Sequence, residues 1–278
     1  MRPVLKPLDA TYRARAVPAA TPRYWSWLFA AKEMRAPLLG IYALEAEWQA
    51  LTDPALDAGV AHLKLAWWRE EMHRLAAGSP IHPIGAYLTG LPRAASVDFA
   101  PLLDAVDACA AQVSGVPLEL GVELEPQCWA LAGGPLTLAS RLAAEIEDEA
   151  SLRICTTAVA AADYLAKALR GYRRDVRAGR VPFAVDELMA AGIDNADLAG
   201  DAPPPQLQRY LDRVRERAAE YFERAAQTLP RAQRSRQRHL LVLAALGLAQ
   251  LRSHAPTAAR RRVRDMLLAW TTARQANS

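Results

Sequence analysis

Residues Arg170–Arg180 read RGYRRDVRAGR, and we call this stretch the basic segment. If the segment is a helix, four of its arginines share one face, because residues three, four and seven apart lie on the same side. These four are Arg170, Arg173, Arg174 and Arg177. A single carboxylate, Asp175, lies among them. The pattern indicates either a solvated helix face or a binding surface for phosphate.

A second charged stretch lies earlier in the chain. Leu39–Leu51 is apolar at its start and carries Glu45 and Glu47 in its later turns. We expect this stretch and the basic segment to face each other across one cavity.

The composition predicts one all-α domain over residues 1–278. Apolar residues make up 52% of the 278 residues, which is enough for a large core, and charged residues make up 23%. Apolar residues recur at helical spacing nearly everywhere, whereas alternating runs of β-branched residues are absent. No linker is long enough to separate two domains, so we expect a single multi-helix bundle around a central cavity.

Several helix limits follow from local signals. Thr21 followed by Pro22 is typical of a helix start, and Pro54–Ala77 reads as one helix. Trp67 and Trp68 cannot share a helix face, so we expect one in the core and the other against a neighbouring helix or a cavity. His82, which precedes a proline, is expected to be structural or capping.

Further along the chain, we expect Asp98–Val113 to be helical. A second helix over Pro126–Ala144 should be interrupted near Gly133-Gly134-Pro135. The acidic stretch Glu145–Glu149 should be an exposed turn before a helix that starts at Ser151.

Three cysteines, Cys109, Cys128 and Cys155, are too widely spaced for a zinc pattern, and their odd number argues against a disulfide framework. Buried thiols in a reducing, cytoplasmic compartment fit this pattern. The start of the chain lacks the apolar core of a signal peptide. The longest apolar run, Leu240–Leu251, is shorter than the roughly 20 residues that span a bilayer. Peripheral contact with the inner face of a membrane stays open.

The formal net charge is +4, and the basic residues are clustered. Besides Arg170–Arg180, the clusters are Arg231–Arg238 and Arg260–Arg264. Such clusters suit phosphates or anionic lipid head groups. No nucleic-acid-binding motif accompanies them, so we do not expect a nucleic acid as partner.

Four stretches together resemble the squalene/phytoene synthase family, which has the all-α isoprenoid synthase fold. Tyr24–Ala43 resembles a family segment with Phe, Arg and then Leu-Tyr-Ala, and Leu63–Pro83 resembles the Trp-Trp-Arg-Glu helix that runs to Gly-x-Pro-x-His-Pro. Cys128–Leu136 resembles the family's Tyr-Cys-x-x-Val-Ala-Gly-x-Val-Gly helix, and Leu165–Asp186 its second aspartate-rich region. Their order and spacing agree over most of the chain.

The resemblance implies a specific chemistry. In this family two aspartate-rich motifs face each other and hold magnesium ions, which bind the diphosphates of two prenyl diphosphates. Diphosphate is a poor leaving group until its charge is neutralised, which Mg²⁺ with carboxylate ligands achieves, while apolar walls shield the carbocation.

The first motif departs from the family pattern. After Leu-Tyr-Ala the family has an arginine and then Asp-x-x-x-Asp, but here Gln49 stands at the leading aspartate. Glu45 and Glu47 are two residues apart, on different helix faces, so they cannot hold one ion together.

The second motif is altered as well. Lys167 stands near the family's asparagine and Gly171 at an aspartate position, whereas Asp175 and Gly179-Arg180 are kept. At most one of about four expected metal-binding aspartates remains, and the arginines beside it would oppose divalent cations. The pattern is closer to a non-catalytic branch, the complex I assembly factors related to phytoene synthase, which are similar at the Glu47 position.

Three hypotheses follow. The preferred one is a protein that binds an isoprenoid diphosphate, an anionic lipid or a protein partner in the retained cavity without synthase turnover. In that case no metal or other cofactor is expected, and arginines replace Mg²⁺. The resemblance implies ligand contacts from Arg35, Lys167, Arg170, Arg174 and Arg180.

The alternative is an active Mg²⁺-dependent prenyltransferase that condenses two farnesyl or geranylgeranyl diphosphates. Its catalytic and metal-binding residues would be Asp175 and Glu47, joined by Asp104 or Asp107. The third hypothesis is a purely structural helical partner protein.

Overall fold

The computed structural model describes residues 7–200, 202–252 and 258–277, and within these ranges the chain is helical without any β-strand. The all-α prediction is therefore confirmed. The α-helices are α1 (Ala10–Ala16), α2 (Pro22–Leu28), α3 (Arg35–Leu51), α4 (Ala58–Ala76), α5 (Pro83–Thr89), α6 (Ala100–Val113), α7 (Leu124–Cys128), α8 (Gly134–Ala143), α9 (Glu149–Arg177), α10 (Val185–Ala190), α11 (Asn195–Ala199), α12 (Pro205–Thr228), α13 (Arg231–Arg234), α14 (Arg238–Arg252) and α15 (Ala258–Gln275).

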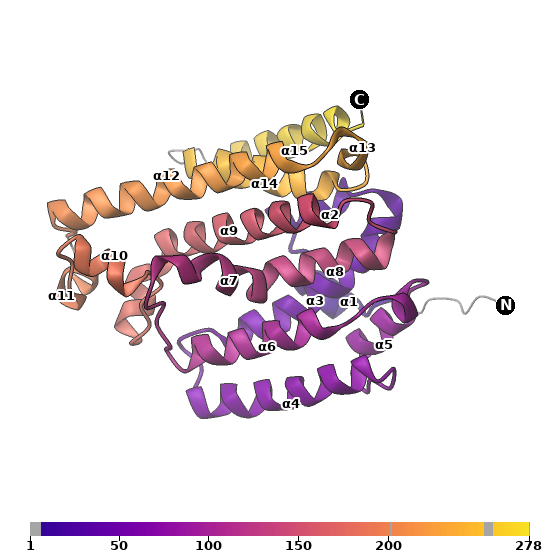
Figure 1. Ribbon diagram of the computed structural model, residues 1–278, viewed down its shortest axis with the longest axis horizontal. Helices are drawn as coiled ribbons and strands as arrows, with labels where there is room; N and C mark the ends of the chain where they lie inside the picture. The colour runs from indigo at the N-terminus through magenta and orange to yellow at the C-terminus, as the bar shows by residue number, and fades with distance from the viewer. Residues whose placement is uncertain (1–6, 201, 253–257, 278) are drawn as a thin grey trace.

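The long helices are stacked roughly side by side. Figure 1 shows α12, α14 and α15 along one side, α9 through the middle, and α6 and α4 along the other side. The short helices α10 and α11 lie beyond the end of α9.

The central helix α9 carries the basic segment in its last turns. It begins where the side chain of Asp148 accepts a hydrogen bond from the backbone N–H of Ser151. It ends before Gly179, whose φ of 77° is easily adopted only by glycine, and the N–H of Arg180 donates to the carbonyl of Asp175. The acidic residues before α9 form the turn that the sequence predicts, but the helix begins at Glu149, two residues before the predicted start at Ser151, because Asp148 caps it.

The two halves of α9 pack into different apolar clusters. The first half, with Leu152 and Cys155, joins the larger cluster built on α3, α4, α6 and α8. The second half, with Leu165 and Tyr172, joins a smaller cluster on α10, α11 and α12. Burial of both faces therefore holds α9 in place along its whole length.

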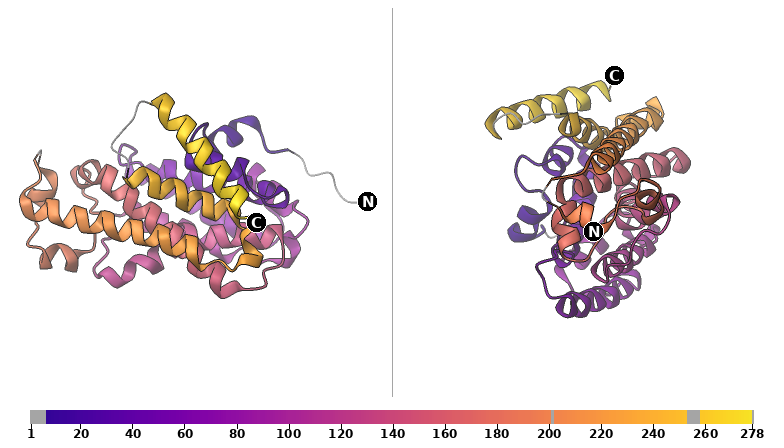
Figure 2. Two further views of the ribbon diagram at one scale, coloured as in Figure 1. Left: turned by 90° about the horizontal axis from the view of Figure 1, so that it is seen from above. Right: turned by 90° about the vertical axis from the view of Figure 1, so that its left-hand side faces the viewer.

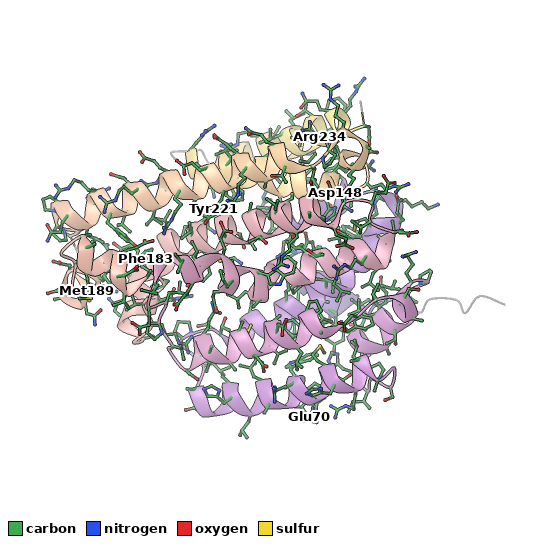
Figure 3. The ribbon with its side chains drawn as sticks, in the orientation of Figure 1. Glu70, Asp148, Phe183, Met189, Tyr221 and Arg234 are labelled. Atoms are coloured by element: carbon green, nitrogen blue, oxygen red, sulfur yellow. The ribbon has the colours of Figure 1, made fainter. Side chains whose placement is uncertain are left out.

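The smaller cluster closes one end of the molecule. Phe183 lies between the rings of Tyr172 and Tyr210, with centroid distances of 5.9 Å and 5.5 Å. Figure 3 shows Phe183 at this end, with the exposed Met189 farther out. These aromatic contacts fix the segment that follows the basic residues.

Most local predictions are confirmed. Thr21 caps α2 with Pro22 in the first turn, and the His82 side chain accepts a hydrogen bond from Ile84 N–H at the start of α5. Trp68 is buried, whereas Trp67 is partly exposed against His82. All three cysteines are buried.

One helix prediction was wrong in detail. The helix predicted from Pro54 begins at Ala58, because the Asp57 side chain caps it by accepting a hydrogen bond from Val60 N–H. The interruption predicted near Gly133 is confirmed, and it takes the form of a π-helical turn, Trp129–Gly133, that joins α7 to α8. No described helix is long and apolar enough to cross a membrane.

Candidate anion-binding cavity

A cavity of about 950 Å³ lies between α3, α6, α7 and the C-terminal half of α9. Apolar side chains such as Leu131, Val116 and Val181 form part of its wall, and charged side chains from α9 form another part. A pocket of this size is within the range of small-molecule sites.

The two predicted stretches meet in this cavity. Glu45, Trp48, Gln49 and Thr52 all line it, because they recur at the spacing of one face of α3. The Arg180 side chain donates a hydrogen bond from Nη1 to the carbonyl oxygen of Thr52 at 2.7 Å, which ties the end of the basic segment to the end of α3. The expectation that the stretches share one cavity is confirmed.

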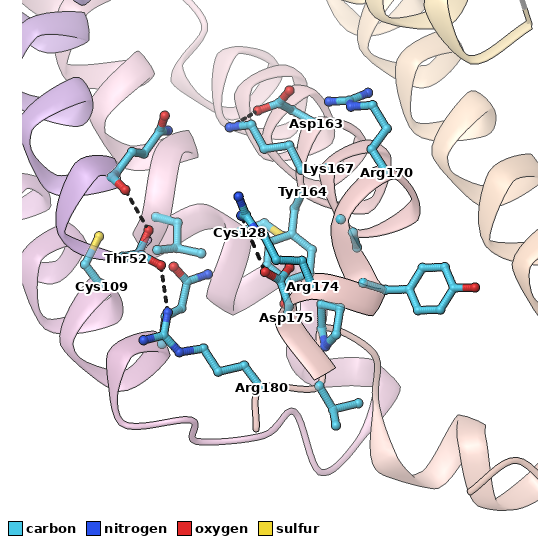
Figure 4. A pocket seen from close by; sticks show the side chains of 18 of the residues that line it. Thr52, Cys109, Cys128, Asp163, Tyr164, Lys167, Arg170, Arg174, Asp175 and Arg180 are labelled. Atoms are coloured by element: carbon cyan, nitrogen blue, oxygen red, sulfur yellow. Dashed lines mark hydrogen bonds and ion pairs between the residues drawn. The ribbon is translucent and has the colours of Figure 1, made fainter. Parts of the chain in front are cut away.

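The charged wall of the cavity is mainly positive. Six cationic side chains line it, against three carboxylates. The cations are Lys167, Arg170, Arg173, Arg174, Arg177 and Arg180, and the carboxylates are Glu45, Asp163 and Asp175. Figure 4 shows Lys167, Arg170, Arg174 and Arg180 around the same space. A ligand that enters this space meets a positive potential.

Asp163 and Lys167 form an ion pair on the cavity wall, with 2.7 Å between Lys167 Nζ and Asp163 Oδ2. Asp163 lies deep within the fold but faces the cavity, so 49% of its side-chain surface is accessible. Burial opposes ionisation of Asp163, but Lys167, together with Arg23 and Arg170, holds the pKa of this carboxyl below its usual range. Asp163 is therefore a carboxylate already neutralised by a lysine.

Glu45 is paired in the same way from another helix. Its Oε2 lies 2.6 Å from an Nη of Arg23 on α2, while its Oε1 is buried without a hydrogen-bond partner among the described residues. Burial raises the pKa of Glu45, although the charges of Arg23 and Lys167 act in the opposite direction. The cation of Arg23 also lies over the ring of Tyr42, at 5.1 Å.

Asp175 lies near the other end of the basic wall. Arg174 Nη2 lies 3.5 Å from its Oδ1, and a Cβ added to Gly171 would lie 3.5 Å from one of its carboxylate oxygens. Asp163 and Asp175 are twelve residues apart on α9, which corresponds to about 18 Å along the helix axis.

Other predicted site residues lie elsewhere. Glu47 does not line the cavity, because it points from the opposite side of α3 and pairs with Arg15 at 2.9 Å. Arg35 donates hydrogen bonds to the carbonyls of Leu28 and Ala30 and thereby holds the connection between α2 and α3. Glu47, predicted as a catalytic residue, and Arg35, predicted as a ligand contact, therefore lie outside the lining of this cavity.

The acidic residues of α6 are also outside the cavity. Asp104 is exposed, and Asp107 pairs with Arg69 on α4 at 2.9 Å. Asp53, four residues after Gln49, is exposed and accepts a hydrogen bond from Ala55 N–H. None of these carboxylates lines the cavity wall.

The residues present do not fit the magnesium cluster that the family resemblance implies. In the described ranges, no three histidine, cysteine, aspartate or glutamate side chains converge to hold a metal ion. Each cavity carboxylate has a cation beside it, and the two on α9 are too far apart to share an ion.

The two thiols in the wall are neutral. Burial raises the pKa of Cys109 to about 12, and burial also raises the pKa of Cys128. Thiols in this state are weak nucleophiles, so they act as apolar wall groups.

The sequence analysis did not identify Asp163 and Arg23 as residues of the site. It also chose Glu47, whereas Glu45 is the glutamate that lines the cavity. Two signals were available. Asp163 and Lys167 are four residues apart on a helix, which is the spacing of an ion pair. Glu45, Gln49 and Thr52 share a face that excludes Glu47. No signal in the sequence connects Arg23 with Glu45.

Comparison with known proteins identifies relatives over most of the chain. A family model described as squalene/phytoene synthase matches residues 18–266. The chloroplastic phytoene synthase of Narcissus pseudonarcissus is 26% identical over 213 residues, which cover 73% of this chain and 49% of that protein. Phytoene synthase 1 of Zea mays is 24% identical over 73% of this chain and 50% of its own length. The chain therefore spans about half the length of these curated relatives.

Solved structures share the fold. A dehydrosqualene synthase in complex with a ligand superposes with a TM-score of 0.69 at 15% identity, covering 96% of both chains. The squalene synthase HpnC from Alicyclobacillus acidocaldarius superposes with a TM-score of 0.65 at 18% identity, covering 96% of this chain and 94% of that one. At these identities the likeness establishes the architecture of the bundle.

Proposed function

Because the chain belongs to the squalene/phytoene synthase family, we propose that its cavity binds the phosphate groups of an isoprenoid diphosphate or a similar anionic lipid directly through arginine and lysine. In this proposal the protein does not condense two prenyl diphosphates.

One observation supports this proposal above the others: the charged wall has six cations, and each of its three carboxylates already has a cation beside it. A magnesium-dependent site needs carboxylates that are available to the ion. Here Lys167 and Arg23 compete for the same carboxylate oxygens, and further arginines would repel the ion.

The same wall suits a phosphate. Guanidinium groups present several N–H donors in one plane and bind phosphate oxygens in pairs. Arg170 and Arg174 are four residues apart on α9, so both can reach one diphosphate. The apolar part of the wall, including Leu131 and Val181, offers a surface for a prenyl or acyl chain.

The competing function is a synthase activity, as the names phytoene synthase and squalene synthase of the relatives suggest. The family resemblance implies that this would be a magnesium-dependent transfer of prenyl groups. In that reaction Asp175 would carry the metal, since it is the family acid that remains at the basic wall. The two functions differ in their response to Mg²⁺, and this difference provides the test.

The test measures binding of farnesyl and geranylgeranyl diphosphate by calorimetry, in EDTA and then in MgCl₂, beside an assay for released diphosphate. We expect binding in EDTA and no release in either buffer. Arg170→Gln with Arg174→Gln should weaken binding at least about tenfold, because charged hydrogen bonds to phosphate contribute about 1.5–3 kcal/mol each. Arg209→Gln, at an exposed arginine on α12, is the matched control and should not change binding.

Diphosphate release that depends on Mg²⁺ and is abolished by Asp175→Ala would overturn this proposal in favour of a synthase. Binding that appears only in MgCl₂ would overturn it as well, because the arginines would then not replace the metal.

A further inference from the structure

The last helix, α15, has an inverted distribution of apolar residues. Its inward face carries small residues, Ala269 and Ala273, which are buried where α15 packs against α14 and α2. Leu268 is partly buried against the same inner cluster, but four other large apolar residues point outward: Val263, Met266, Leu267 and Trp270 are 56%, 40%, 51% and 47% exposed. We call these four residues the outward stripe. They recur at positions i, i+3, i+4 and i+7, so they form one continuous apolar surface.

The position of α15 is well defined by its contacts, so the stripe is not exposed through loose packing. Ala269 and Ala273 pack with Trp25, Val242 and Leu246 in a cluster of their own. Arg238 and Ser235 both hydrogen-bond to the side chain of Asn277, which fixes the end of the helix. Figure 2 shows α15 on the outside of the bundle, crossing α14.

The charges around the stripe are positive. Arg261, Arg262 and Arg274 are exposed on α15, and the guanidinium of Arg274 lies 5.4 Å from the ring of Trp270. The only acid of the helix, Asp265, is buried and pairs with Arg264 at 2.9 Å. The outer surface of α15 therefore combines apolar side chains with cations and presents no carboxylate of its own.

This charge pattern favours one kind of occupant over another. A symmetric contact between two copies of the chain would bring the arginines of one α15 towards those of the other, which is unfavourable. An anionic lipid surface offers negative head groups to the arginines and acyl chains to the stripe, and tryptophan is enriched at that boundary. We propose that the outward stripe of α15 lies in the surface of a membrane that contains anionic lipids.

This membrane contact does not rest on the function proposed for the cavity. The stripe and the cavity have no residue in common, so each can be disrupted alone. If both proposals hold, α15 keeps the protein at the membrane, where isoprenoid lipids are found.

The experiment is flotation of the full chain with two kinds of vesicle, phosphatidylcholine alone and phosphatidylcholine mixed with phosphatidylglycerol. We expect binding to the mixed vesicles only, and binding should weaken as salt rises. Leu267→Ser with Trp270→Ser should lower the bound fraction by at least about tenfold, because membrane binding scales with the apolar area that is buried. Leu63→Ser, which changes a leucine that is 75% exposed on α4, is the matched control and should leave binding unchanged.

A second readout tests insertion directly. Brominated acyl chains should quench part of the tryptophan fluorescence of the unmodified chain, and Trp270→Phe should remove that part. The proposal is overturned if the double variant still binds the mixed vesicles, or if quenching is the same after Trp270→Phe. It is also overturned if sedimentation shows a dimer that the double variant dissociates while the vesicles bind nothing.

Discussion

Lys167 Nζ lies 2.7 Å from Asp163 Oδ2, one helical turn away on the cavity wall. The pair has two consequences. It removes a carboxylate from any metal site, and it leaves a half-exposed ammonium at the edge of the space where a ligand would lie.

Lys167→Met should weaken binding of farnesyl diphosphate in EDTA about tenfold, which corresponds to about 1.4 kcal/mol. The free energy of unfolding should fall by less than about 1 kcal/mol, because the pair is half-exposed and such pairs contribute little. Calorimetry measures the first quantity and urea denaturation the second. Lys64→Met, at an exposed lysine on α4, is the control. Unchanged binding in Lys167→Met would mean that Lys167 pairs with Asp163 but does not contact the diphosphate.

Arg23→Leu should be much more costly than Lys167→Met. It leaves Glu45 buried without its cation, and breaking a buried ion pair in this way costs about 3–5 kcal/mol. The double variant Arg23→Leu with Glu45→Leu should recover most of this loss, because no isolated charge remains. Urea denaturation of the three proteins at neutral pH measures both effects, and a double variant as unstable as the single one would contradict this explanation.

The same single variant should respond to pH in a defined direction. Burial already raises the pKa of Glu45, and loss of Arg23 raises the pKa further. A carboxyl with a raised pKa binds its proton more tightly in the folded state than in the unfolded state. The stability of Arg23→Leu relative to the unmodified chain should therefore increase as the pH falls from neutral towards the ordinary glutamate pKa. Repeating the denaturation at pH 5 tests the sign.

Gly171→Asp should introduce a response to magnesium. The new carboxylate would lie one turn before Asp175, and even the added Cβ would approach the Asp175 carboxylate to 3.5 Å. Without metal the two acids repel each other, so the midpoint of thermal unfolding should fall. Mg²⁺ should then raise it by binding between them. Gly171→Asn adds the same bulk without the charge and should show no Mg²⁺ response. Equal responses of the two variants would exclude a metal pair at this position.

His239 provides a stability prediction unrelated to the cavity. It is fully buried on α14, and neither ring nitrogen has a hydrogen-bond partner in the described part of the chain. Burial, together with the charge of Arg238, lowers the pKa of His239 from 6.5 to about 3. The unfolded chain therefore takes up a proton below pH 6.5 that the folded chain does not, and stability is lost at about 1.4 kcal/mol per pH unit down to about pH 3.

His239→Leu removes this titrating group. The difference in unfolding free energy between the variant and the unmodified chain should grow in favour of the variant between pH 7 and pH 4. Taking the difference cancels carboxylates that titrate in the same window, such as Asp163, whose lowered pKa also makes stability fall with pH. A constant difference across this range would show that the folded chain protonates His239 as readily as the unfolded chain does.

Features that depend on neighbouring residues could be predicted from the sequence, whereas contacts between distant helices could not. Caps such as Thr21 and His82 were predictable, because a cap depends on a few neighbouring residues. Helical spacing placed four arginines of the basic segment on one face, and the family resemblance placed that face at the cavity. The same spacing could have selected Glu45 over Glu47. Thr52 and Glu45 are seven residues apart and therefore share a face of the helix, whereas Glu47 lies on another face.

Other features depend on contacts that no local pattern contains. The partner of Glu45 is Arg23, on a different helix, and their pairing follows only from how α2 packs on α3. The outward stripe of α15 was missed for a related reason. Periodicity indicates which residues share a face, but it does not decide whether the large or the small residues turn inward.

The π-helical turn at Trp129–Gly133 acts as a rotational offset in the chain. One extra residue in a helical turn rotates everything after it by about 100° relative to what precedes it. Before the turn, Cys128 faces the cavity, and after it Leu136 and Leu138 face the core that contains α3. Deletion of Ala132 would restore ordinary α-helical winding and swing one of these faces away from its partner. A single extra residue therefore sets the rotation that lets the helix line the cavity before the turn and pack into the core after it.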